Sequence, residues 1–179
     1  MDRDRSRLLV ADLADEEDVR SCRRSALDTT AGVRAVVQRV RMARVELGGE
    51  TVAAVGRGVC VLLGVAATDD TAHADRLAGR IARLRIFENE DGRFDRSVLD
   101  AAGEALVVSQ FTLIADSKRQ RGTRPDFSRA APKEHAEPLY ERFCQALRDL
   151  GVPVETGVFG ARMELALVND GPVTVVLDM

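Results

Sequence analysis

Apolar residues in this chain gather in short runs separated by turn residues, a pattern typical of β-strands. The segments expected to form strands are 34–47, 51–56, 58–66, 105–115, 152–159, 162–169 and 173–179. The run at 58–66 is apolar almost throughout, which favours a buried strand. Gly48 and Gly49 separate the first two segments and predict a hairpin turn there.

Two segments instead carry apolar residues at helical spacing. In the first, at 69–87, the apolar face consists of Leu77, Ile81 and Leu84, and Asp70 or Thr71 supplies the N-cap. In the second, at 131–151, the apolar face consists of Leu139, Phe143, Leu147 and Leu150. Gly151 is expected to end this helix, and Pro138 to kink it or to mark its effective start. With about eight strands and two main helices, the pattern predicts an α+β fold of mostly antiparallel sheet, barrel-like or layered.

The chain changes character near Val33. Residues 1–32 are rich in Asp, Glu and Arg and show little regular apolar pattern, so they are expected to form an extension, either a loose helix or a disordered arm. A further hypothesis is that translation starts at Val33 and that the extension lies upstream of the true start. Residues 33–179 are then the folded domain.

Composition narrows the choice of function. The 179 residues are 45% hydrophobic and 31% charged, with a net charge of −3, which is ordinary for a globular protein. No apolar stretch is long enough to span a membrane. Cys22, Cys60 and Cys144 lie far apart, so neither a disulfide framework nor a zinc site is expected, and a cytoplasmic location is favoured. No nucleotide-binding or metal motif is found, so the sequence predicts no cofactor and no metal.

A polar interruption stands inside the strand-like segment 105–115. If the segment is extended, Gln110 and Thr112 lie on one face, and Ser109 and Phe111 lie on the other. One interpretation is the polar side of an edge strand; the other is a site where an amide and a hydroxyl orient a polar substrate.

Basic residues crowd the loop that follows this segment. They are Lys118, Arg119, Arg121 and Arg124. Such loops are commonly just solvated, but one that follows a polar strand end could bind the phosphates of a polyanion.

Several motifs in order resemble D-aminoacyl-tRNA deacylases: RAVVQRV, LRIFENEDGRF, SQFTLIAD, EPLYERF and LVNDGPVTVVLDM. The resemblance runs from Val33 to Met179. It implies the deacylase fold and a hydrolase that cleaves the ester between a D-amino acid and tRNA, with glycyl-tRNA also accepted. No cofactor is implied.

The resemblance also implies site residues. Ser109, Gln110, Phe111 and Thr112 would form the catalytic pocket. Gly171 and Pro172 would form a Gly-cisPro motif that rejects L-amino acids and enters the pocket of the partner in a homodimer. Arg39 would brace this motif, and Met163 would lie near the terminal adenosine.

Two points stay open at this level. Thr112 is a candidate nucleophile by residue type, but no base stands near it in the sequence, so a water is the preferred nucleophile. Two other functional classes also fit: a non-catalytic module that binds RNA or dimerises, and an esterase or amidase acting on free D-amino-acid derivatives.

Overall fold

The computed structural model describes residues 32–116 and 122–179. Except for Gly32, the predicted extension at 1–32 lies outside the described residues, as do Lys118, Arg119 and Arg121 of the basic loop. Within the described part, no helix is long and apolar enough to cross a membrane.

The described residues form a six-stranded sheet, a two-stranded hairpin and the helices that pack on the sheet. The strands are β1 (Arg34–Leu47), β2 (Glu50–Val55), β3 (Gly58–Gly64), β4 (Phe87–Glu88), β5 (Phe94–Arg96), β6 (Glu104–Ser109), β7 (Val154–Thr156) and β8 (Glu164–Asp178). The helices are α2 (Thr71–Ala82), α3 (Lys133–Asp149) and the short 3-10 helix η1 (Phe111–Ile114).

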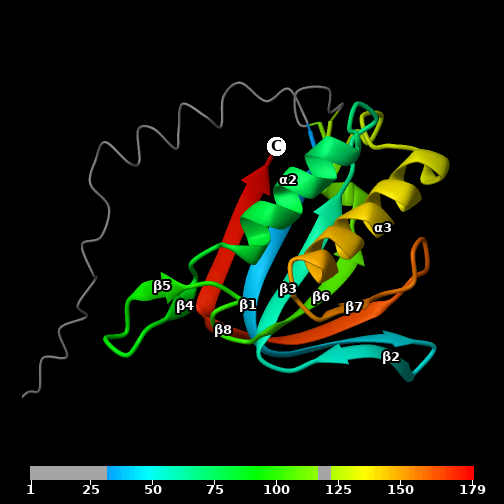
Figure 1. Ribbon diagram of the computed structural model, residues 1–179. Helices are drawn as coiled ribbons and strands as arrows, with labels where there is room; N and C mark the ends of the chain where they lie inside the picture. The colour runs from blue at the N-terminus through cyan, green and yellow to red at the C-terminus, as the bar shows by residue number, and fades with distance from the viewer. Residues whose placement is uncertain (1–31, 117–121) are drawn as a thin grey trace, which may run out of the picture. The chain divides into compact units, whose positions relative to one another are not determined.

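Strand β1 organises the sheet. It pairs antiparallel with β2, β3 and β8, while β6 runs parallel to β3 and β7 runs parallel to β6. Strand β2 also lies against β6 and β7, so the sheet curls toward a barrel (Figure 1). The predicted α+β class with a mainly antiparallel sheet is confirmed, whereas the parallel β3–β6–β7 part was not predicted.

Alternation along the strands sends side chains into two separate cores. Val61 of β3 and Val107 of β6 pack toward α2 and α3, which cover this face of the sheet (Figure 1). Cys60 and Leu106, their neighbours in sequence, point to the opposite face and pack against the inner side of the curled sheet. Burial raises the pKa of the Cys60 thiol to about 12, so this cysteine is an inert part of the core.

The two helices follow the predicted apolar faces. Asp70 is the N-cap of α2, because its carboxylate accepts a hydrogen bond of 2.9 Å from the backbone N–H of His73. In α3, Phe143 and Leu147 are fully buried. Pro138 lies inside α3 rather than at its start, on the exposed side, and it has no N–H to donate to the Glu134 carbonyl one turn earlier.

Candidate active site

The segment that follows β6 is a helix, not a strand. β6 ends at Ser109, and residues Phe111–Ile114 form η1. The expected alternation of Gln110 and Thr112 on one strand face is therefore wrong. The two side chains still meet, because the Gln110 amide donates a hydrogen bond to the Thr112 hydroxyl across the tight turn.

Contacts with β1 and β3 explain why the strand stops here. The backbone N–H of Gln110 donates to the Leu63 carbonyl at 2.7 Å, and the Arg34 guanidinium donates to the Leu113 carbonyl at 3.0 Å. Gly64 leaves room for the turn, since a Cβ at that position would lie 3.0 Å from the Gln110 carbonyl oxygen. Ile114 fills a buried position, so an apolar residue that looked like strand sequence serves the helix instead.

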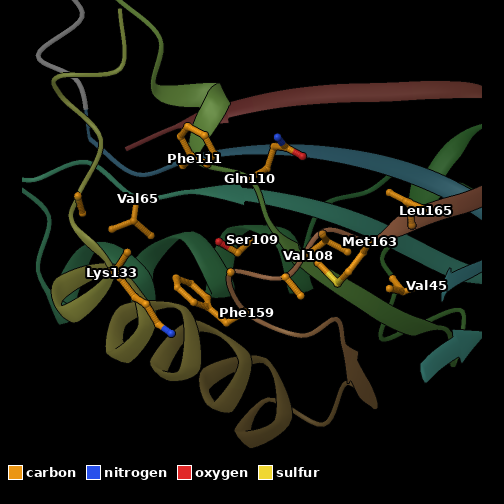
Figure 2. A pocket seen from close by; sticks show the side chains of 14 residues that line it. Val45, Val65, Val108, Ser109, Gln110, Phe111, Lys133, Phe159, Met163 and Leu165 are labelled. Carbon is orange, nitrogen blue, oxygen red and sulfur yellow. The ribbon is translucent and has the colours of Figure 1, made fainter. Parts of the chain in front are cut away.

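A cavity of about 390 Å³ opens beside this turn. Its walls include Val65 after β3, Ser109–Phe111 at the end of β6, and Phe159–Ala161 after β7 (Figure 2). These three strands run parallel, so their carboxyl ends meet at one place. Ligands commonly bind at the carboxyl ends of parallel strands, where the following loops converge.

Aromatic and sulfur side chains form the apolar wall of the cavity. The Phe159 ring lies 5.5 Å from the ring of Tyr140, whose hydroxyl donates a 2.8 Å hydrogen bond to the Val107 carbonyl. Burial raises the pKa of Tyr140, so the hydroxyl stays protonated and keeps this bond. Met163 packs against Gly157, where a Cβ would lie 2.9 Å from the Met163 sulfur.

The rim of the cavity carries an exposed aromatic pair. Phe111 is 57% exposed, and its ring contacts Phe127 edge to face with centroids 5.2 Å apart. Lys133, at the start of α3, lines the same cavity. The sequence signals for Phe127, Lys133 and Phe159 were too weak to select them as site residues, although Phe159 ends the expected strand 152–159, shortly before Met163.

A second group of predicted residues lies on β8. Gln38 of β1 pairs with Thr174, and Val40 pairs with Asn169, so the ladder skips residues 170–173. The predicted pair of strands at 162–169 and 173–179 is thus a single strand interrupted by an excursion, which we call the 170–173 loop. Gly171 and Pro172 in this loop are exposed, and the peptide bond between them is cis.

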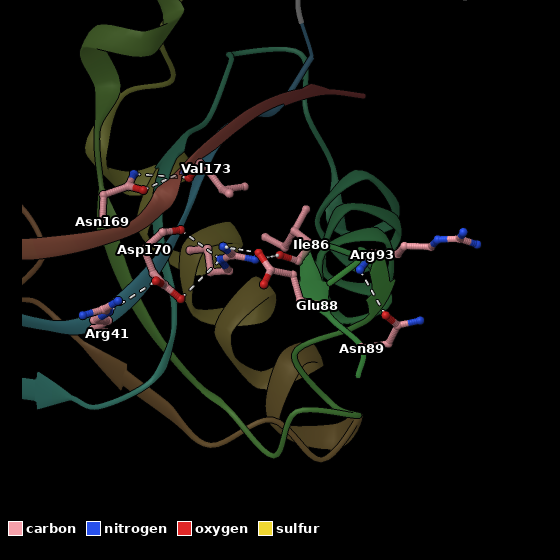
Figure 3. Close-up of polar contacts among 9 residues, drawn as sticks. Arg41, Ile86, Glu88, Asn89, Arg93, Asn169, Asp170 and Val173 are labelled. Atoms are coloured by element: carbon pink, nitrogen blue, oxygen red, sulfur yellow. Dashed lines mark hydrogen bonds and ion pairs between the residues drawn. The ribbon is translucent and has the colours of Figure 1, made fainter. Parts of the chain in front are cut away.

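Three side chains contact the 170–173 loop: Asn169, Arg39 and the exposed Arg41. Figure 3 shows Asn169 beside Val173 and Arg41 beside Asp170. Asn169 closes its base, because its amide oxygen accepts from the Val173 N–H at 2.7 Å and its amide nitrogen donates to the Val173 carbonyl at 3.2 Å. Arg39, buried opposite the loop, donates through Nε to the Asp170 carbonyl at 2.9 Å. Asn169 was missed as a positioning residue; its place just before Asp-Gly-Pro was the available signal.

The structure therefore divides the eight predicted site residues. Ser109, Gln110, Phe111 and Met163 line one cavity, and Thr112 contacts Gln110 just outside it. Arg39, Gly171 and Pro172 gather around the 170–173 loop and do not line this cavity. The roles given to these residues stay predictions.

Comparison with known proteins gives the family. A family model described as D-Tyr-tRNA(Tyr) deacylase matches residues 36–178, almost the whole described domain. The chain belongs to this deacylase family. The family match covers both the cavity residues and the 170–173 loop.

Individual deacylases are similar over nearly their full length. A D-aminoacyl-tRNA deacylase from Roseiflexus sp. (strain RS-1) is 59% identical over 146 residues, which are 82% of this chain and 93% of that protein. One from Symbiobacterium thermophilum is 57% identical, with 82% and 95% covered. The one from Thermus aquaticus is 53% identical, with 82% and 95% covered.

Solved structures share the deacylase fold. One described as "c-Myc DNA Unwinding Element Binding Protein" superimposes with a TM-score of 0.76 at 44% identity, covering 82% of this chain and 98% of that one. Another, described as a probable eukaryotic D-amino acid tRNA deacylase, has a TM-score of 0.68 at 19% identity, covering 82% and 99%. The second likeness bears on the fold alone.

Proposed function

We propose that this chain hydrolyses the ester bond of D-aminoacyl-tRNA and rejects L-aminoacyl-tRNA, acting as a homodimer where tRNA is charged, in the cytoplasm. The observation that carries the proposal is the separation of two groups within one chain. A cavity with polar groups on one side and apolar walls on the other is suited to an aminoacyl-adenosine end. The exposed 170–173 loop lies outside that cavity and is free to enter the cavity of a second copy.

The polar side of the cavity supplies the groups that an ester substrate needs. Phe111 stands at the first position of η1, where a backbone N–H has no partner within the helix. Such a donor can stabilise the oxyanion that develops when the ester carbonyl is attacked. Since the ester is already activated, orientation and exclusion of wrong substrates contribute more than acid–base chemistry.

Water, positioned by main-chain groups and the 2′-hydroxyl of the tRNA, is the nucleophile in this proposal. The Thr112 hydroxyl accepts a hydrogen bond from the Gln110 amide, and an amide cannot take its proton as a base would. We expect Thr112→Ala to keep kcat on D-Tyr-tRNA within about threefold of wild type, because an uninvolved exposed hydroxyl contributes little. Single-turnover hydrolysis measures this. Complete loss of hydrolysis with intact tRNA binding would make Thr112 the nucleophile.

In this proposal, main-chain groups rather than side chains distinguish D- from L-amino acids. The carbonyl groups of Gly171 and Pro172 accept hydrogen bonds from the substrate ammonium and leave no space for an L side chain. Glycyl-tRNA is accepted, since glycine has no side chain to reject. We expect wild type to prefer D-Tyr-tRNA over L-Tyr-tRNA by about 100-fold or more in kcat/KM, as a pocket with no space for a side chain in the L position can achieve.

The Gly171→Ala variant tests this reading. Gly171 has φ of +138°, and a Cβ there would lie 2.6 Å from Cγ2 of Val173 and 3.3 Å from the Arg39 guanidinium. The loop must shift, so we expect the preference for D over L to fall about tenfold or more. Gly48→Ala, at φ of +61° in the distant β1–β2 turn, is the matched control and should keep the preference.

The same assays separate the rival functions. A binding module would retain charged tRNA without releasing an amino acid. An esterase for free D-amino-acid derivatives would show activity that is indifferent to salt, whereas hydrolysis of a tRNA ester should weaken as salt rises. Equal cleavage of D- and L-Tyr-tRNA by wild type would refute the stereochemical part of the proposal.

A further inference from the structure

The Arg39 side chain, on β1, contacts both the β4–β5 hairpin and the 170–173 loop. We propose that this hairpin sets the position of the loop, and that Glu88 and Phe94 are positioning residues for stereochemical selection. The inference rests on the proposed function of the 170–173 loop. It adds a part of the molecule that contains none of the eight predicted site residues, although its segment LRIFENEDGRF was one of the motifs that carry the family resemblance.

The guanidinium of Arg39 donates hydrogen bonds to both the loop and the hairpin. Figure 3 shows Asp170 of the loop and Ile86 and Glu88 of the hairpin, which accept them. On the loop side, Nε donates to the Asp170 carbonyl at 2.9 Å. On the hairpin side, Nη1 donates to the Ile86 carbonyl at 2.7 Å, and Nη2 donates to the Glu88 carboxylate at 3.2 Å. Because a guanidinium is a rigid plane with donors in fixed directions, the hairpin contacts determine where Nε points.

Phe94 supports the same guanidinium from its face. Glu88 and Phe94 are cross-strand partners in the β4–β5 ladder, so their side chains are neighbours. The Arg39 Cζ atom lies 5.3 Å from the centre of the Phe94 ring. Phe94 is 55% exposed and belongs to neither apolar core, so stacking on Arg39 is the contact that accounts for an aromatic residue here.

The hairpin itself is anchored, so it can serve as a reference point. Phe87 at its base is fully buried, and Ile86 just before it is 5% exposed. The loop side is anchored less firmly, because the β1–β8 ladder skips residues 170–173. Arg39 therefore links the anchored β4–β5 hairpin to the less firmly held 170–173 loop.

The alternative interpretation is that Glu88 only neutralises the charge of Arg39. The Glu88 side chain is 50% exposed, and ion pairs at that exposure stabilise a fold only slightly. The Asp170 carboxylate, 3.5 Å from Arg39 Nε, already lies beside the buried charge. The two readings differ in what is lost: a counter-charge affects stability, whereas a positioning residue affects the ratio of D to L cleavage.

The test compares Glu88→Ala, Phe94→Leu and the double variant with wild type in hydrolysis of D- and L-Tyr-tRNA. Each single change should lower the ratio of kcat/KM for D over L about two- to fivefold, and the double change about tenfold. Melting temperatures should stay close to wild type. Phe94→Tyr keeps the ring and should restore the ratio, and Glu90→Ala, an equal change of charge in the same hairpin without a contact to Arg39, should leave it unchanged.

Two results would overturn the inference: an unchanged ratio in the double variant, or equal losses on both substrates that follow a lower melting temperature. A wild-type protein that does not distinguish D from L would refute the proposed function instead. The wild-type ratio, measured first, keeps the two failures apart.

Discussion

Replacing Arg39 by Met should lower kcat/KM on D-Tyr-tRNA by about 100-fold, if the 170–173 loop contacts the substrate as proposed, because a misplacement of about 1 Å in such a group commonly costs that much. Methionine fills the volume of the side chain but removes the donors to Asp170, Ile86 and Glu88. The 170–173 loop then keeps only the contacts of Asn169 and of the exposed Arg41. Steady-state hydrolysis by folded protein, checked by its melting temperature, measures the effect.

Arg41 provides the matched control for this change. It lies two residues along the same strand and contacts the Asp170 carboxylate at 3.3 Å, but its side chain is 75% exposed. Arg41→Met should therefore change kcat/KM less than about threefold, as expected for an exposed ion pair. Arg39→Lys retains charge without three directed donors, so it should resemble Arg39→Met. Wild-type activity in Arg39→Met would show that Arg39 is not needed to position the 170–173 loop.

The largest loss of stability is expected for Phe143→Ala. Phe143 is fully buried where α3 packs on the sheet. Truncating a buried Phe to Ala typically lowers the free energy of unfolding by about 3–5 kcal/mol, and by the lower half of that range if the helix moves to fill the cavity. Urea unfolding followed by circular dichroism gives the change in the free energy of unfolding.

Glu141→Ala is the control for the effect of placing an alanine in α3 without removing a buried side chain. Glu141 is exposed on the same helix, two residues earlier, so its removal should alter stability by less than about 0.5 kcal/mol. If Phe143→Ala cost no more than Glu141→Ala, the packing of α3 against the sheet would be incorrectly described. Phe143 does not line the cavity, so the folded fraction of Phe143→Ala should keep its activity.

The sequence predicts features that depend on local pattern. The spacing of Leu77 and Ile81 gives the buried face of α2, and Asp70 gives its N-cap. Gly48 and Gly49 both adopt positive φ and form the predicted turn. In each case the residues that determine the outcome lie within a few positions of one another, so a single sequence contains the information.

Other features depend on contacts between distant residues, and pattern alone misses them. The strand pattern continues through Leu113 and Ile114, but β3 ends beside Ser109 and Arg34 captures the Leu113 carbonyl, so a helix forms. Arg39 was selected only by family resemblance. Nothing local to it indicates that Ile86 and Asp170 will accept its hydrogen bonds, since they lie 47 and 131 residues away.

The cavity shows the same limit. Its walls come from the ends of β3, β6 and β7, which are parallel strands joined by long connections. Hydrophobic runs predict that such strands exist but not which strands are neighbours, so Lys133 and Phe159 could not be grouped with Ser109 beforehand. Only the residues carried by a motif could be named in advance.

The separation of the cavity residues from the 170–173 loop has a genetic consequence. If each complete site takes its cavity from one chain and its loop from another, then two alleles that are each inactive alone can restore activity when they are expressed together. A chain damaged at Ser109 and a chain damaged at Gly171 would form mixed dimers that each retain one intact site. Mixing them in equal amounts would recover roughly a quarter of the sites, as random pairing of two subunit types requires.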